Sequence, residues 1–216
     1  MPGAWEGIRP VMMIGIPNTN LVTVNWALEL RAMWFPPNII FRGWSGLPID
    51  VARNACVHDA RQAGVKYLLF LDSDVVPSRP DWVKLLLEAQ QPIISGLYWS
   101  KKGEPGMWLK GEDGKLASVK KWAAGNVFEV DAVGSGAMLI DMRVFDEIDK
   151  VCGKQKYYDW EIQDPANVGE NKSEDFHFCL LAQKAGFAIL VHTGVEMYHE
   201  QIIAWGAKGE VAKIHD

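Results

Sequence analysis

The sequence predicts an α/β fold: a single Rossmann-like domain with a mixed, mostly parallel sheet flanked by helices. Strand-like and helix-like segments alternate over the first 100 residues, which is typical of a parallel, doubly wound sheet. Residues 67–71 are five apolar residues in a row, too few for an ordinary helix and suited to a strand buried on both faces. The 216 residues suffice for one domain with a sizeable core.

The first half of the chain is expected to supply the parallel part of the sheet. In order, we expect a strand over 11–16, a helix over 21–33, a strand over 38–42, a helix over 50–63, a strand over 67–71, a helix over 80–89 and a strand over 92–99. Helical spacing of apolar residues, with Asn20 as N-cap, predicts the first helix. Asp50 is the expected N-cap of the second helix, and Gly64 lies past its end.

The second half is expected to mix strand directions. Residues 101–128 break the alternation, and Asp113-Gly114 predicts a hairpin turn within them. The later elements are a strand over 130–140 interrupted by glycines, a helix over 143–150, a polar loop over 157–172, a helix from its cap Ser173 through 184, and a strand over 187–191.

Composition argues against several classes of protein. The net charge of -5 and the sequence pI near 5.6 do not suit a nucleic-acid groove. Three cysteines without a C-x-x-C pair are typical of buried thiols in a reducing compartment. No apolar run is long enough to span a membrane and residues 1–10 lack a signal pattern, so we expect a cytoplasmic protein without an integral membrane segment.

Two carboxylates, Asp72 and Asp74, directly follow the strand over 67–71. On an extended backbone they would point to the same side with their roots about 7 Å apart, so that one divalent cation, or a cation and a sugar hydroxyl, can bridge them. Ligands of open α/β sheets also bind at the carboxyl ends of strands. The alternative is a turn whose Asp residues cap the next helix.

A second acidic pair, Glu174 and Asp175, lies in the first turn of a predicted helix. The helix dipole alone favours acids there, and the same dipole keeps Asp175 ionised, as a general base for a hydroxyl requires. His199 follows the last predicted strand, and imidazole joins carboxylates on transition metals. His192, at the end of that strand, is its rival.

Two further features are open to more than one interpretation. Arg53, in the second predicted helix, is either an exposed helix residue or a group that reaches a phosphate through its planar fork. Gly134-Ser135-Gly136 lies inside a predicted strand, where glycines indicate a bulge or the close approach of a ligand.

Taken in order, these motifs resemble those of the GT-A glycosyltransferases, which have the nucleotide-diphospho-sugar transferase fold. Within that group, they most resemble the motifs of the family 2-like enzymes. The matching segments are residues 14–17, 50–54, 67–77, 133–140, 173–175 and His199. The resemblance runs from residue 11 to about residue 199. It implies a nucleotide-binding half over 1–100, an acceptor-binding and catalytic half over 101–199, and a tail over 200–216.

The resemblance implies a role for each matching residue. Those implied to contact the nucleotide are Pro17, Asn18, Thr19, Arg53, Asp72 and Ser73. Those implied at a cation are Asp74, His199 and Asp72. Asp74 and His199 would bind the cation, and Asp72 would contact the ribose or a metal-bound water. Those implied at the donor or acceptor sugar are Gly134, Ser135, Gly136 and Glu174. Asp175, assisted by Glu174, is the implied catalytic base.

The implied activity is metal-dependent transfer of a sugar from a nucleoside-diphosphate sugar to the hydroxyl of a carbohydrate or another acceptor. UDP is favoured over GDP as the nucleotide. A site that adds imidazole to carboxylates favours Mn²⁺ over Mg²⁺. Direct attack by the acceptor would invert the anomeric configuration.

Two other functions are consistent with parts of the sequence. A strand followed by D-x-D-x-V also resembles the first motif of haloacid-dehalogenase-type phosphatases, with Asp72 as nucleophile. That motif normally lies near the N-terminus, whereas here two strand–helix units precede it. The chain could also be an inert module that binds a nucleotide-sugar or a glycan, although the intact acidic set, which includes Asp175, argues against this.

Overall fold

The computed structural model describes residues 11–100, 103–154, 156–160 and 173–200, and the backbone of 203–205 and 211–213. The N-terminal segment over 1–10, most of the polar loop predicted over 157–172 and much of the tail predicted over 200–216 lie outside the described residues. Within the described part, no helix is long and apolar enough to cross a membrane.

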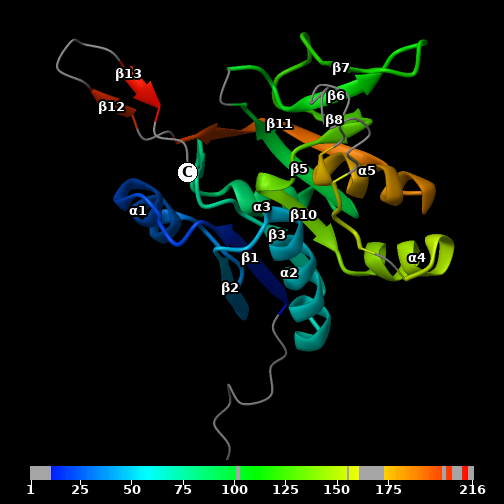
Figure 1. Cartoon of the computed structure of the whole chain (residues 1–216), viewed down its shortest axis with the longest axis horizontal. Coiled ribbons are helices and arrows are strands. Elements are labelled where there is room, and N and C mark those ends of the chain that lie inside the picture. Colours follow the sequence, from blue (N-terminus) through cyan, green and yellow to red (C-terminus); the bar gives the residue numbers. More distant parts are fainter. Residues whose placement is uncertain are drawn as a thin grey trace, which may run out of the picture.

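A mixed eight-stranded sheet forms the centre of the molecule, in the order β2-β1-β3-β10-β5-β11-β4, with β8 paired to β11 (Figure 1). The strands are β1 (Met12–Asn18), β2 (Ile39–Ser45), β3 (Tyr67–Phe70), β4 (Val75–Pro77), β5 (Ile93–Tyr98), β8 (Val127–Val130), β10 (Met138–Asp141) and β11 (Ile189–His199). The parallel first half is confirmed, since β1 pairs in parallel with β2 and β3. The prediction of a mostly parallel sheet is wrong, because β10, β4 and β8 all pair antiparallel with their neighbours.

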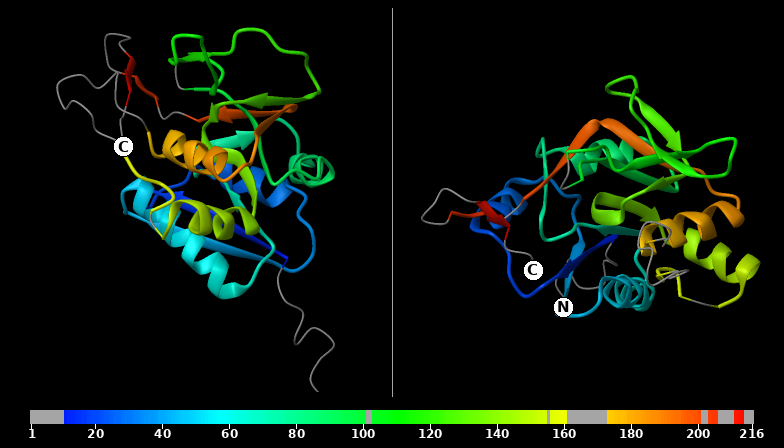
Figure 2. Two further views of the ribbon diagram at one scale, coloured as in Figure 1. Left: turned by 90° about the vertical axis from the view of Figure 1, so that its right-hand side faces the viewer. Right: turned by 45° about the horizontal axis from the view of Figure 1, so that its top comes forward.

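Helices cover both faces of this sheet (Figure 2). They are α1 (Val24–Ala32), α2 (Ile49–Ala63), α3 (Trp82–Glu88), α4 (Arg143–Cys152) and α5 (Glu174–Lys184). Side chains of α2, α4 and α5 pack into one core cluster, and those of α1 and α3 into the other. Strand β3 contributes side chains to both clusters, Leu68 and Phe70 to the first and Leu69 to the second. The predicted burial of this strand on both faces is therefore confirmed.

The helix termini confirm some predicted caps and correct others. Gly64 ends α2 in the left-handed conformation at φ 64°, as predicted. Asn20 is not the cap of α1: Thr23 is, because its hydroxyl accepts a bond from the Trp26 amide at 2.9 Å. Asp50 is not the cap of α2 either, since that helix begins after Pro48 and Asp50 lies in its first turn.

A second, three-stranded sheet interrupts the alternation after β5. It contains β6 (Met107–Lys110), β7 (Leu116–Ser118) and β9 (Ala132–Val133), and the predicted hairpin between β6 and β7 is confirmed. The strand predicted over 130–140, interrupted by glycines, is divided in the structure: a short 3-10 helix, η1 (Ser135–Ala137), separates β9 from β10. Within the predicted tail, β12 (Ile203–Trp205) and β13 (Val211–Lys213) form an antiparallel pair.

The last strand of the central sheet is longer than its sequence pattern predicts. β11 does not end at Val191 but continues to His199, with alternate residues buried along its length. Its end pairs antiparallel with β4, a three-residue strand that the sequence pattern did not reveal, and Val75 lies opposite His199. This pairing brings the chain that leaves β3 next to the end of β11.

Candidate functional site

Asp74 and His199 lie together because β4 pairs with β11. The Glu200 amide donates to the Asp74 carbonyl at 2.7 Å, and Asp74 Oδ2 lies 3.8 Å from His199 Nε2. His192 precedes His199 by seven residues on the same strand, which places it roughly 20 Å away. The structure therefore brings His199, and not His192, to Asp74.

Asp72 and Asp74 do not stay on one side of an extended chain as predicted. The Val75 amide donates to the Asp72 carbonyl at 3.1 Å and closes a turn directly after β3. The side chain of Asp72 is 17% exposed and that of Asp74 is 39% exposed. The two carboxylates therefore lie in different surroundings, Asp72 inside the domain and Asp74 at its surface.

Arg53 of α2 joins Asp72 to the two acids at the start of α5. Its two terminal nitrogens donate to the two carboxylate oxygens of Asp72, each at 3.0 Å. Its Nε lies 3.6 Å from Glu174 Oε1 and 3.5 Å from Asp175 Oδ1. We call these four residues the arginine cluster; it holds α2, the end of β3 and the start of α5 in one arrangement.

Aromatic rings complete the surroundings of Arg53, which is only 2% exposed. Its guanidinium carbon lies 5.2 Å from the ring centre of Phe70 and 5.8 Å from that of Tyr158, both within reach of a cation–π interaction. A guanidinium this deeply buried requires paired carboxylates, because an unpaired buried charge is strongly unfavourable. Its predicted contact with a nucleotide stays a prediction.

The arginine cluster changes the pKa of its members. Burial lowers the pKa of Arg53, but the charges of Asp72, Asp175 and Glu174 outweigh this and hold the pKa well above its usual value. Burial, reinforced by the charge of Asp175 and opposed by Arg53, raises the pKa of Glu174 to about 7. Burial also raises the pKa of Asp175 against the opposing charge of Arg53. Both acids are therefore stronger bases than ordinary carboxylates.

The glycine-rich turn at η1 lies against these acids. The Asp72 amide donates to the Gly136 carbonyl at 2.9 Å, and a Cβ at Gly136 would lie 2.8 Å from Asp72 Oδ2. A Cβ at Gly134 would lie 3.8 Å from Asp175 Oδ2. The expected close approach at these glycines thus involves the chain's own carboxylates, and the predicted contact of Gly134, Ser135 and Gly136 with a sugar stays a prediction.

Tyr98, the last residue of β5, was not among the predicted site residues. Its hydroxyl is hydrogen-bonded to His199 Nε2, and His199 Nδ1 donates to the Trp99 carbonyl at 2.6 Å. A pairing of β5 with β11 would have indicated this contact, but that pairing is not visible in sequence. Glu200 was missed too; its carboxylate accepts from Thr23 and Asn25 and so links the site to the start of α1.

Three of the residues predicted to contact the nucleotide, Pro17, Asn18 and Thr19, lie at the carboxyl end of β1, beside the end of β3. Pro17 is buried, Asn18 is half-buried and Thr19 is exposed. Asn18 Oδ1 accepts a hydrogen bond from the Ser45 hydroxyl at 2.6 Å, which connects the end of β1 to the end of β2. Ser73 is half-buried at the turn after β3. These four residues share one end of the sheet with the arginine cluster.

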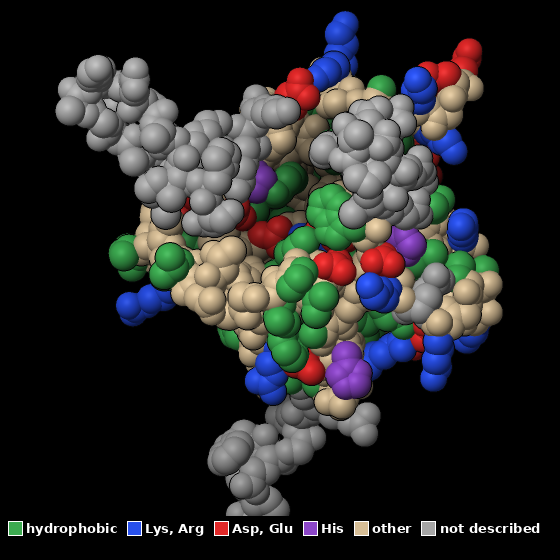
Figure 3. All heavy atoms as spheres, viewed as in Figure 1, with side chains coloured by type: hydrophobic (Ala, Val, Ile, Leu, Met, Phe, Trp, Pro, Cys, Tyr) green, Lys and Arg blue, Asp and Glu red, His purple; other side chains and the backbone are tan. Residues whose placement is uncertain are grey.

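The side chains that could bind a cation here are few, so such a cation would also bind a ligand. Among the residues that the structure describes, no group of three or more His, Cys, Asp or Glu side chains is placed to hold a metal ion. Both oxygens of Asp72 accept from Arg53, which disfavours direct coordination by Asp72. Asp74 and His199 remain as two donors, and a cation with few protein ligands is typical of sites where phosphate oxygens complete the coordination. Acidic side chains gather near the centre of the face in Figure 3.

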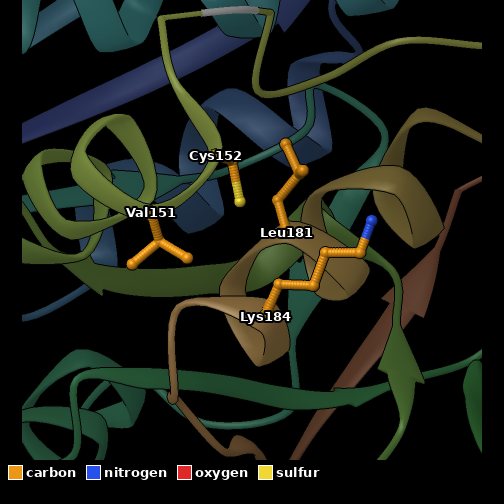
Figure 4. A pocket seen from close by; sticks show the side chains of 4 residues that line it. All are labelled: Val151, Cys152, Leu181 and Lys184. Carbon is orange, nitrogen blue, oxygen red and sulfur yellow. The ribbon is translucent and has the colours of Figure 1, made fainter.

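A pocket of about 480 Å³ lies elsewhere, between α4 and α5 (Figure 4). Its lining residues are Val151, Cys152, Leu181 and Lys184. Leu181 and Lys184 follow Glu174 by seven and ten residues, so they lie roughly 10–15 Å along α5 from the acids. This pocket is therefore separate from the candidate site.

Comparisons with known proteins inform the fold. No family model matches the sequence, and no curated protein matches it either. A crystal structure of A197 from STIV is similar with a TM-score of 0.60 and 18% identity, over 95% of this chain and 94% of that one. A crystal structure of GalNAc-T7 with UDP, GalNAc and Mn²⁺ is similar with a TM-score of 0.51 and 9% identity, over 90% of this chain and 44% of that one. At such identities the likeness concerns the fold alone.

Proposed function

We propose that this chain is a GT-A-type glycosyltransferase, which moves a sugar from a nucleoside-diphosphate sugar to an acceptor hydroxyl. One observation carries the proposal: Arg53 connects Asp72 to Glu174 and Asp175, while the β4–β11 pairing places His199 beside Asp74. A potential cation site and a potential base thus adjoin at one end of the sheet. The fold likeness to GalNAc-T7, crystallised with UDP, GalNAc and Mn²⁺, supports the same substrate class.

Asp175 is the proposed general base. Its side chain is 18% exposed, so it can meet an acceptor, whereas that of Glu174 is 6% exposed. The raised pKa of Asp175 favours uptake of the hydroxyl proton by its carboxylate as the acceptor oxygen attacks the anomeric carbon. Glu174 orients the acceptor or Asp175 itself. Attack from the side opposite the diphosphate inverts the anomeric configuration.

Asp74 and His199 are the proposed ligands of a divalent cation, with Mn²⁺ favoured because imidazole joins a carboxylate. When bound, such a cation neutralises charge on the departing diphosphate. The bond from His199 Nδ1 to the Trp99 carbonyl fixes the imidazole so that its other nitrogen faces Asp74.

The remaining residues are proposed to bind the donor. Pro17, Asn18, Thr19 and Ser73 would contact the nucleotide, for which UDP is favoured over GDP. The turn over 134–136 would lie against the donor sugar, since its glycines leave room beside the acids.

A phosphatase that uses Asp72 as nucleophile is less consistent with this geometry. A nucleophilic carboxylate must aim one oxygen at phosphorus, whereas both oxygens of Asp72 accept from Arg53. An inert binding module would have the same residues without turnover, and only an assay separates it from a transferase.

The test is to incubate the protein with UDP- and GDP-sugars, either with Mn²⁺ or with EDTA, and to measure released nucleoside diphosphate. We expect release that requires Mn²⁺ and increases when an acceptor is added. Asp81→Asn, at an exposed helix start, is the control and should release as much as wild type. Nucleotide binding without release would indicate the inert module, and phosphate release from simple phosphomonoesters would indicate the phosphatase.

A further inference from the structure

Tyr98 contacts the nitrogen of His199 that a cation would use. His199 Nδ1 faces the Trp99 carbonyl at 2.6 Å, and because a carbonyl only accepts, Nδ1 carries the hydrogen. In the neutral imidazole, Nε2 then presents its lone pair. The Tyr98 hydroxyl is hydrogen-bonded to Nε2 and is the donor of that bond.

This hydrogen bond and a metal bond to Nε2 exclude each other. Nitrogen–metal bonds of imidazole are about 2.0–2.2 Å long and use the same single lone pair. Asp74 Oδ2 lies 3.8 Å from Nε2, too far for a hydrogen bond, so Asp74 does not replace Tyr98 as the partner of this nitrogen. A cation held by Asp74 and His199 therefore has to displace the Tyr98 hydroxyl.

The ring of Tyr98 is built into the site rather than lying loosely over it. A Cβ at Gly106 would lie 2.7 Å from Tyr98 Cδ1, one at Gly134 would lie 3.3 Å from the same atom, and one at Gly136 would lie 3.0 Å from Cε2. The ring also packs edge-on against the His199 imidazole, with ring centres 4.4 Å apart. Three glycines thus leave the space in which this ring holds its hydroxyl against His199.

We propose that Tyr98 is a positioning residue that competes with the cation for His199 and so sets the affinity of the site for the metal. The inference rests on the proposed function, because that function supplies the cation. The Tyr98 hydroxyl occupies the lone pair of Nε2 until a cation displaces it, and it therefore weakens the binding of that cation.

The test compares Mn²⁺ binding by wild type and Tyr98→Phe, measured by the loss of the free Mn²⁺ signal in electron paramagnetic resonance. The variant keeps the ring and loses only the hydroxyl. Since one hydrogen bond contributes about 0.5–1.5 kcal/mol, we expect Mn²⁺ to bind about two- to twelve-fold more tightly. In a His199→Gln background the same change should have no effect on Mn²⁺ binding.

Tyr157→Phe is the matched control, because it removes a hydroxyl that bonds Asp149 at 2.7 Å on α4. It should leave the Mn²⁺ affinity unchanged. The inference would be overturned if Tyr98→Phe bound Mn²⁺ no more tightly than wild type. It would also be overturned if the gain in affinity were the same in the His199→Gln background, or if neither wild type nor Tyr98→Phe bound Mn²⁺.

The proposed function can fail separately. Tighter Mn²⁺ binding by Tyr98→Phe in a protein that releases no nucleoside diphosphate would support the competition and contradict the transferase. Mn²⁺-dependent release with no change in affinity would support the transferase and contradict the role of Tyr98.

Discussion

The arginine cluster and the Asp74–His199 pair lie at the same end of the sheet but differ in burial. Arg53 is 2% exposed and binds both oxygens of Asp72, whereas the side chain of Asp74 is 39% exposed. Two acids only two residues apart therefore have different surroundings. Asp72 is therefore an internal partner of Arg53, while the side chain of Asp74 is partly exposed.

Removal of Arg53 should have the largest effect on stability. Arg53→Met leaves three acids without their cation, and removing one partner of a buried ion pair typically costs about 3–5 kcal/mol. We expect a loss of this size in the free energy of unfolding in urea. Arg61→Met is the control: that side chain pairs with Asp146 and Asp149 but is 33% exposed, so its loss should cost about 1 kcal/mol or less. Equal losses in the two variants would contradict the account.

Replacement of the proposed base should affect turnover far more than Mn²⁺ binding. Asp175→Asn keeps the shape of the side chain but cannot accept the acceptor proton. We expect sugar transfer to fall about 10²–10⁴-fold, the usual contribution of a general base, with Mn²⁺ affinity unchanged. The measurement is the initial rate with saturating donor and acceptor. A rate within a few-fold of wild type would remove Asp175 from the mechanism.

The ionisation of Glu174 should give stability a smaller, pH-dependent change. The pKa of Glu174 is raised from 4.5 to about 7, so its favourable contribution is complete below pH 4.5 and is lost as the pH rises through 7. Glu174→Gln has no such ionisation. Between pH 5 and pH 8, wild type should lose on the order of 2 kcal/mol of unfolding free energy relative to the variant. Parallel curves for the two proteins would show that Glu174 ionises without a penalty.

Elements with strong local signals were predictable from the sequence. The apolar run at β3 and the glycine after α2 each have a direct physical cause, and both predictions are confirmed. The long strand β11 buries every second residue, including Ile189, Val191 and Val195, but the polar Thr193 occupies one of these buried positions, so the apolar alternation in the sequence stops at Val191.

The site was predictable as a set of residues but not as an arrangement. Asp72, Asp74, Asp175 and His199 were predicted from the chemistry of their side chains and their order in the chain. The turn that separates Asp72 from Asp74, and the strand of three residues that brings His199 to Asp74, depend on contacts between distant segments. Tyr98 gave no local signal, since its role arises from the pairing of β5 with β11.

If Asp74 binds the proposed cation and Asp72 does not, Mn²⁺ titration of Asp72→Asn and Asp74→Asn will separate the two acids after β3. We predict that Asp74→Asn abolishes Mn²⁺ binding while the free energy of unfolding stays within about 0.5 kcal/mol of wild type. Asp72→Asn should retain Mn²⁺ binding but lose about 3 kcal/mol of stability, because Arg53 loses its bidentate partner. Loss of Mn²⁺ binding in Asp72→Asn together with full binding in Asp74→Asn would contradict the account.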